Sequence, residues 1–132
     1  FDMNFYQPTM KYFEQVQKVG QVTGSTHAML AFTPEGKFLG GTEDVGRHVA
    51  LDKLIGMRAM KKWGPVVVFL SSRASYEMVQ KAAVTGIEIL FAISAPTNRA
   101  LRLAKECDLT LSAFCRDNRA NIYNAPERLL NL

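Results

Sequence analysis

The sequence has 132 residues, of which 48% are hydrophobic and 21% are charged. This length and balance are typical of one globular domain with its own core and exclude an intrinsically disordered chain. The net charge is +4, but the basic residues form no run, so the composition favours no nucleic-acid partner. No apolar run approaches the ~18–20 residues of a membrane span. Two cysteines are too few for a disulfide scaffold or a cysteine-rich zinc module.

The first half of the chain predicts a helix, a β-hairpin and a longer helix. In order, the expected elements are a helix over residues 8–20 within an N-terminal segment 1–21, strands over 26–33 and 38–42 around a turn at 34–37, and a helix over 44–63. Periodic apolar positions in the long helix are candidates for the core, namely Val49, Leu51, Leu54, Ile55, Met57 and Met60.

The second half alternates between strands and helices. Strands are expected over 66–70, 87–93 and 109–114, with a short one near 122–123, and helices over 76–85 and from Thr97 or Asn98 to about 107. Ser75 has the side chain of an N-cap. Alternation with short loops predicts right-handed crossovers and parallel strands. We therefore expect a single α/β domain over residues 1–132, a three-layer sandwich whose mixed, mostly parallel sheet carries the hairpin at one edge.

Polar loops follow three of these strands, and ligands of open α/β sheets bind beyond the carboxyl ends of the strands. The candidate side chains in the loops are Ser72, Arg73, Ser75, Ser94, Thr97, Cys115, Arg116, Asp117, Asn118 and Arg119. Two of the loops lead into helix N-termini, which attract anions. Six of the eight basic residues after position 66 are arginines, against two of the eight before it. Because guanidinium groups match phosphate in geometry, the pattern predicts a phosphorylated ligand.

A second cluster, residues 43–48, joins the hairpin to the long helix. Glu43 and Asp44 are expected at the start of that helix, where acidic groups suit the dipole. Arg47 and His48 would occupy its first turn, so that an ion pair of Arg47 with Asp44 and a ligand-binding role are both open. The sequence leaves His48 as a candidate acid–base or hydrogen-bonding group.

His27 and the two cysteines do not form a deaminase-type zinc site. That site needs His-x-Glu and a later Pro-Cys-x-x-Cys, whereas here Met29 occupies the position of the glutamate. His27 therefore fits a core position better than a metal ligand, and no metal site is predicted. Cys107 is expected to be a small core residue. Cys115 is the better candidate for a reactive thiol, because Arg116 beside it favours the thiolate.

Several long segments together resemble one family, the formate dehydrogenase accessory sulfurtransferases known as FdhD. The segments are TGSTHA at 23–28, EDVGRHVALDKLIG at 43–56, SRASYEMVQKAA at 72–83, ISAPT at 93–97 and NIYNAPER at 121–128. The resemblance extends from about Val22 to Arg128. It implies a domain similar in fold to cytidine deaminases, without their zinc, which agrees with Met29 in place of the glutamate.

The resemblance also implies a function. Members of the family are cytoplasmic and support formate dehydrogenase maturation: they take persulfide sulfur from a cysteine desulfurase and pass it to bis-molybdopterin guanine dinucleotide, the molybdenum cofactor. The resemblance also implies a dimer that binds guanine nucleotide on this domain, so GDP is expected to be a partial mimic of the cofactor. The family's cofactor-binding segment matches Phe114, Cys115, Arg116, Asp117, Asn118 and Arg119, and we add Ser72, Arg73, Ser75, Ser94, Thr97, His27, Arg47 and His48 as weaker candidates.

One departure from the family pattern concerns the sulfur carrier. The family carries persulfide on a Cys-x-x-Cys motif, and this sequence contains no such pair. We expect that motif upstream of Phe1, in a longer native protein, so that the chain binds the cofactor without being an active sulfurtransferase by itself. Two alternatives remain: a noncatalytic scaffold between cysteine desulfurase and formate dehydrogenase, or a hydrolase or deaminase that uses His27 or His48.

Overall fold

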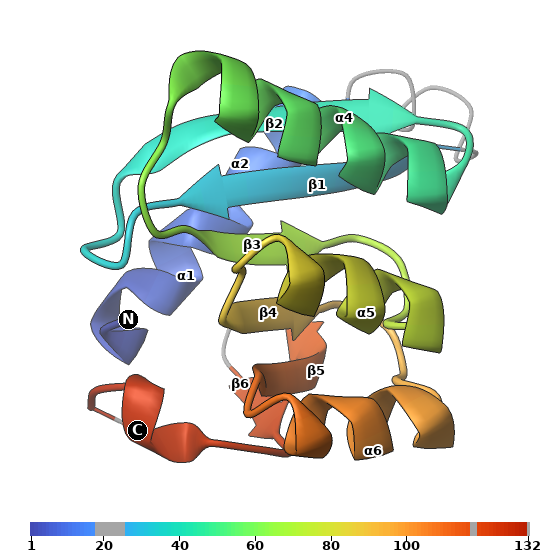
Figure 1. Cartoon of the computed structure of the whole chain (residues 1–132). Coiled ribbons are helices and arrows are strands. Elements are labelled where there is room, and N and C mark those ends of the chain that lie inside the picture. Colours follow the sequence, from blue (N-terminus) through green and yellow to red (C-terminus); the bar gives the residue numbers. More distant parts are fainter. Residues whose placement is uncertain (18–25, 117–118, 132) are drawn as a thin grey trace.

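The computed structural model describes residues 1–17, 26–116 and 119–131 (Figure 1). The helical elements are η1 (Met3–Phe5), α1 (Tyr6–Met10), α2 (Tyr12–Val16), α4 (Arg47–Lys61), α5 (Tyr76–Val84), α6 (Asn98–Glu106) and η2 (Pro126–Arg128). The strands are β1 (His27–Phe32), β2 (Phe38–Asp44), β3 (Val67–Leu70), β4 (Ile89–Ala92), β5 (Thr110–Arg116) and β6 (Arg119–Ile122). None of the described helices is long and apolar enough to span a membrane.

All six strands form one mixed sheet in the order β2-β1-β3-β4-β5-β6. The centre is parallel, because β3 pairs with β4 and β4 with β5 in that sense. The remaining pairs are antiparallel: β1 with β2, β1 with β3, and β5 with β6. Since β1 opposes both of its neighbours, β2 runs in the same direction as β3, β4 and β5. The carboxyl ends of these four strands therefore lie at one edge, on the right in Figure 1.

The sheet separates two hydrophobic layers, as expected of a three-layer α/β fold. Helices α4, α5 and α6 cover one face, where alternate strand residues such as Val68, Leu90 and Leu111 pack against Leu51 and Val79. The N-terminal segments η1, α1 and α2 cover the other face (Figure 1). The sequence prediction of an α/β sandwich with a hairpin at the sheet edge is confirmed.

Aromatic rings dominate the layer beneath the N-terminal helices. Phe69 on β3 stacks on Phe91 of β4 with 4.6 Å between ring centroids, and both side chains are 1% exposed. Tyr6 and Phe1 each lie 5.6 Å from Phe91. Rings at these separations add stabilisation beyond their buried area. The N-terminal segment is thus packed into the domain by aromatic contacts.

The predicted helix starts are confirmed in the second half of the chain. The Ser75 hydroxyl accepts a hydrogen bond from the Met78 N–H at the start of α5, and the Thr97 hydroxyl accepts one from the Ala100 N–H at the start of α6. The chain leaves α5 through Gly86, whose φ of +81° is a conformation that glycine adopts without steric cost.

The first half departs from the prediction at both helices. The long helix starts at Arg47 instead of residue 44, because Asp44 continues β2 opposite His27 and Gly46 is the extended N-cap. The N-terminal helix is broken into η1, α1 and α2, and α2 ends at Val16. Residues 18–25, which include the end of the predicted helix, lie outside the described part.

Two groups of predicted core residues are exposed. Val49 is 48% exposed and Met60 is 85% exposed on the outer side of α4, whereas Leu51 and Leu54 are buried as predicted. Cys107 is exposed at the end of α6, so its placement in the core was wrong. The apolar pattern of α4 is wider than the stripe that faces the sheet, which is why periodicity alone assigned too many of its residues to the core.

Replacing Phe91 with alanine should lower the free energy of unfolding by about 3–5 kcal/mol, because a ring packed on three others leaves a cavity. Urea denaturation followed by circular dichroism measures the loss. Tyr123→Ala, at a ring that is 41% exposed, is the matched control and should change stability by less than about 1 kcal/mol. An equal loss in both variants would contradict the proposed core.

Candidate functional site

The carboxyl edge of the sheet gathers most of the polar residues singled out in the sequence. The loops after β3 and β4 leave the sheet there, β5 ends there, and α4, α5 and α6 all begin there (Figure 1). His27, at the first residue of β1, and Asp44, at the last of β2, lie at the same edge as directly paired residues. Helix starts carry partial positive charge and free N–H groups, so this edge is electrostatically suited to an anion. We call it the carboxyl rim.

Backbone hydrogen bonds tie the loops of the carboxyl rim together. Ala74 and Pro96 form a parallel bridge, and the Thr97 N–H donates to the Ala74 carbonyl at 3.1 Å. The Arg116 guanidinium donates to the Ile93 carbonyl at 2.9 Å, which fixes the end of β5 beside the end of β4. The loops after β3 and β4 are therefore adjacent, and the end of β5 is joined to the second of them.

Two arginines oppose each other across β5 and β6. Arg116 and Arg119 are directly paired in the register, and both are exposed. Like charges at directly opposed strand positions are destabilising. No carboxylate is paired with either arginine among the described residues. The pair is thus an unneutralised cationic site at the carboxyl rim.

Phe114 lies beside this pair in an unusual backbone conformation. Its φ is +53°, and its ring is 38% exposed. The register between β5 and β6 shifts between Ala113 and Arg116, as a bulge does. A bulky residue in the left-handed region costs of order 1–3 kcal/mol and is concentrated at functional sites. The bulge thus leaves Phe114 exposed two positions before Arg116 on β5.

The other candidates in the loops after β3 and β4 divide into buried or capping side chains and exposed ones. Ser75 and Thr97 cap helices, and the buried Ser72 bonds to the Arg73 carbonyl and the Met78 sulfur, so these side chains shape the loops. Ser94 and Arg73 are exposed at the carboxyl rim. Asp117 and Asn118 lie outside the described residues.

The start of α4 contains an unpaired buried donor. The Nε of Arg47 is inaccessible to solvent and has no hydrogen-bond partner among the described residues. The alternative ion pair with Asp44 does not form, because Asp44 binds Lys53 at 2.8 Å and accepts from the Gly46 N–H at 2.9 Å. The Lys53 hydrogen bond is the main reason why the pKa of Asp44 is lowered. Arg47 is therefore left with donor capacity at the carboxyl rim.

His48, in the first turn of α4, interacts electrostatically with Glu77 of α5. The pKa of Glu77 on α5 is lowered mainly by its own backbone N–H, with smaller contributions from the Ser75 hydroxyl and the charges of His48 and Arg99. His27 is half-buried at the start of β1, neither a fully buried core residue nor a freely exposed one. Among the residues that the structure describes, no group of three or more His, Cys, Asp or Glu is arranged to hold a metal ion.

Cys115 does not have the character of a reactive thiol. It is 1% exposed, and its Sγ lies 3.9 Å from the Ser112 hydroxyl. Burial raises the pKa of the Cys115 thiol, and this outweighs the opposing hydrogen bonds of Tyr6 and Ser112 and the charge of Arg116. Arg116 does favour the thiolate as expected, but burial of the sulfur is the larger effect, so the expectation of a reactive Cys115 was wrong.

Sequence reasoning missed one residue that supports the site. The Tyr6 hydroxyl on α1 donates to the Arg119 carbonyl at 2.9 Å, so the N-terminal helices hold β6 in place. The two residues are 113 positions apart. No local sequence signal connects them.

Comparison with known proteins identifies the family. The chain matches the FdhD/NarQ family over residues 3–130. The chain belongs to that family. It also matches the crystal structure of a protein described as a formate dehydrogenase accessory protein from Desulfotalea psychrophila, with a TM-score of 0.93 and 30% sequence identity. The match covers 98% of this chain and 59% of that chain, so this FdhD/NarQ chain spans somewhat more than half of the relative's length.

Alkylation with iodoacetamide should distinguish the two cysteines. Cys107 is exposed and should be modified first, whereas Cys115 should react more slowly by about tenfold or more, because its thiol is buried and its pKa is raised. Peptide mass spectrometry reports each site, and both should react equally in urea. Preferential modification of Cys115 in the native protein would contradict the burial described here.

Proposed function

We propose that this FdhD/NarQ chain binds the guanine dinucleotide form of the molybdenum cofactor at the carboxyl rim, as part of a protein required for formate dehydrogenase maturation. The observation that carries the proposal is the opposed pair Arg116 and Arg119, which lacks an acidic partner among the described residues. A polyanion between the two guanidinium groups would convert their repulsion into charge-assisted hydrogen bonds.

The other groups at the carboxyl rim fit the remaining parts of such a ligand. Phe114 offers an exposed ring on which a guanine base could stack. Arg73 and Ser94 are exposed in the adjacent loops, and the unpaired Nε of Arg47 adds a donor at the start of α4. We assign the pyrophosphate to Arg116 and Arg119, and the base to Phe114. His27 and His48 are secondary candidates for polar contacts.

The sulfur-transfer step is not assigned to either cysteine of this chain. Cys115 is buried with a raised thiol pKa. Cys107 follows the last residue of α6, whose nine residues span about 13 Å from the carboxyl rim. We propose that this chain contributes cofactor binding to a sulfurtransferase that receives sulfur from a cysteine desulfurase and serves formate dehydrogenase. A cytoplasmic homodimer is part of the same proposal.

Calorimetric titration with GDP tests the nucleotide site. GDP should bind the wild-type chain, and Arg116→Ala and Arg119→Ala should each weaken binding by about 1–3 kcal/mol, because each removes a charge-assisted contact. Arg102→Ala, which removes an exposed arginine from the middle of α6, is the matched control and should bind GDP as the wild type does.

Two outcomes would contradict this assignment. Absence of GDP binding by the folded wild type would favour the alternative, a scaffold that joins cysteine desulfurase to formate dehydrogenase without using nucleotide. An equal loss of affinity in Arg102→Ala and Arg116→Ala would show that only the general positive charge of the chain matters.

A further inference from the structure

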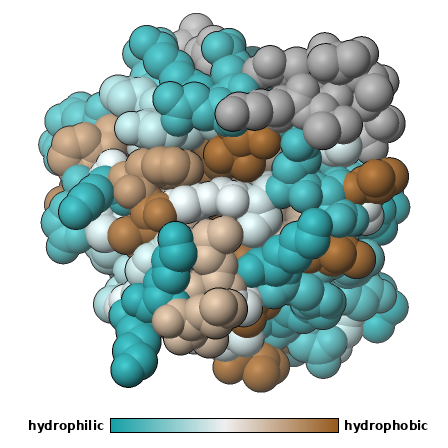
Figure 2. Space-filling view, turned by 90° about the horizontal axis from the view of Figure 1, so that it is seen from above, coloured by the Kyte–Doolittle hydropathy of each residue, from teal (hydrophilic) through white to brown (hydrophobic). Residues whose placement is uncertain are grey.

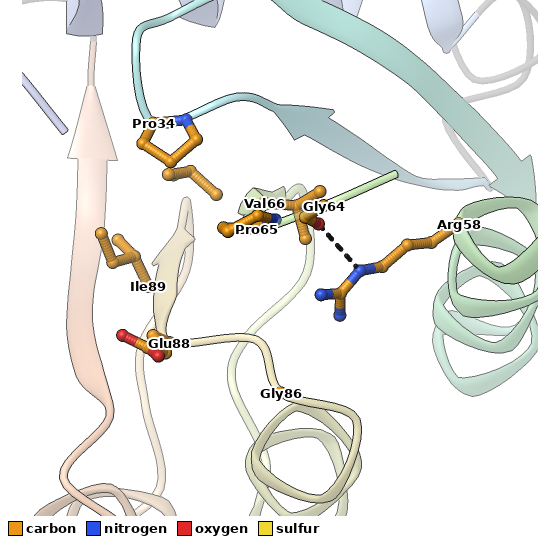
Figure 3. A pocket seen from close by; sticks show the side chains of 9 residues that line it. Pro34, Arg58, Gly64, Pro65, Val66, Gly86, Glu88 and Ile89 are labelled. Atoms are coloured by element: carbon orange, nitrogen blue, oxygen red, sulfur yellow. Dashed lines mark hydrogen bonds between the residues drawn. The ribbon is translucent and has the colours of Figure 1, made fainter. Parts of the chain in front are cut away.

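The edge of the sheet opposite to the carboxyl rim contains two hollows that meet at one arginine. The first has a volume of about 380 Å³ and is lined by Pro34, Arg58, Gly64, Pro65, Val66, Val67, Gly86, Glu88 and Ile89 (Figure 3). The second has a volume of about 430 Å³ and is lined by Ile55, Arg58, Ala59, Lys62, Trp63 and Thr85. Arg58 belongs to both, so they form one surface, which we call the amino-edge groove.

Arg58 lies between the two hollows of the amino-edge groove and is held in place by two hydrogen bonds. Its Nε donates to the Gly64 carbonyl at 3.3 Å, drawn as a dashed line in Figure 3, and its Nη1 donates to the Thr85 carbonyl at 2.7 Å. These bonds join the end of α4 to the loop before β3 and to the end of α5. A side chain held at two points loses little entropy on binding, so the groove is preformed.

The walls of the groove are largely apolar. Pro34, Pro65 and Ile89 surround the first hollow in Figure 3, and Ile55 and Trp63 line the second. The edge of the Trp63 ring packs on the backbone of β2, since a Cβ added at Gly40 would lie 2.9 Å from its Cη2 atom. This contact holds Trp63 in place as a wall of the second hollow.

The charge around the groove is positive at the end of α4. The Lys61 ammonium lies 5.9 Å from the centre of the Trp63 ring, and Lys62 is exposed without an ion pair among the described residues. The one carboxylate that lines the groove, Glu88, is paired with Arg128 at 3.2 Å. The net field at this edge thus attracts negative charge.

Met60, the next-to-last residue of α4, is 85% exposed and adjoins the two lysines in sequence, although it lines neither hollow. Figure 2, viewed from above the orientation of Figure 1, shows hydrophobic and hydrophilic side chains side by side on the surface. Largely apolar walls with Lys61 and Lys62 at one end are complementary to a chain segment that combines large apolar side chains with carboxylates.

We propose that the amino-edge groove is a docking site for an acidic segment of a partner protein, in which an aromatic or large aliphatic side chain enters the hollows and neighbouring carboxylates meet Lys61 and Lys62. This site is separate from the carboxyl rim and does not depend on nucleotide binding there. A partner docked at the amino edge leaves the opposite edge open to its own ligand.

Trp63 is the single tryptophan of the chain, so its fluorescence reports on the groove directly. The probe is a random copolymer of glutamate and tyrosine in which glutamate predominates, with excitation at a wavelength that tryptophan alone absorbs. The copolymer should change the Trp63 emission saturably. The double variant Lys61→Glu, Lys62→Glu should weaken that binding by about tenfold, because two favourable charge contacts become repulsive.

A matched control and two further probes make the result decisive. Lys105→Glu, at an exposed lysine in the last turn of α6, should bind the copolymer as the wild type does. Polyglutamate without tyrosine and single-stranded oligothymidylate should both bind much more weakly. The proposal is overturned if the copolymer does not affect Trp63, if the control variant loses as much affinity as the double variant, or if either of these probes binds as tightly as the copolymer.

Discussion

The direction of one strand, β1, determines where every functional feature of this chain lies. Because β1 is antiparallel to both β2 and β3, the strand before α4 runs in the same direction as the strands before α5 and α6. All three helices therefore begin at one edge of the sheet and end at the other. Their positive ends, and the loops that follow the strands, are collected at the carboxyl rim. A parallel β1 would have removed α4 and its Arg47 from that edge.

The two edges of the sheet therefore carry different charged and apolar groups. At the carboxyl rim, the positive charge of guanidinium groups adds to that of the helix N-termini, and the exposed Phe114 precedes Arg116 by two positions on β5. At the amino edge, helix ends carry partial negative charge, which Arg58, Lys61 and Lys62 at the end of α4 more than offset. Apolar hollows form there because the hairpin turn and two helix–strand loops meet without filling the space between them. The first edge suits a polyanionic small molecule, and the second suits an acidic segment of a partner protein.

Much of the architecture was predictable because it depends on local signals. The buried strands β3 and β4 are short apolar runs, and Ser75 and Thr97 are N-caps recognisable from residue type and position. The start of α4 was predicted too early, because Glu43 and Asp44 are residue types that favour a helix N-terminus. In the structure both residues belong to the end of β2.

The site was only partly predictable because its decisive features are nonlocal. The loops that carry Arg73 and Ser94, and the end of β5 with Arg116, could be placed at one edge from strand order alone, and the structure brings them together. The opposition of Arg116 to Arg119 depends on a register shift within β5 and β6, which no sequence pattern specifies. The burial of Cys115 depends on Tyr6, more than a hundred residues away. The amino-edge groove combines three separate loops with α4, so only the folded chain contains it.

The most direct test of the account is a nuclear magnetic resonance titration of the isotopically labelled chain with GDP. The account predicts that backbone amides of the loops after β3, β4 and β5 and of the first turn of α4 shift together with one saturation curve, while those of Gly64 and Gly86 at the amino edge do not move. Shifts centred on the amino edge, or spread without a common curve over both edges, would contradict it.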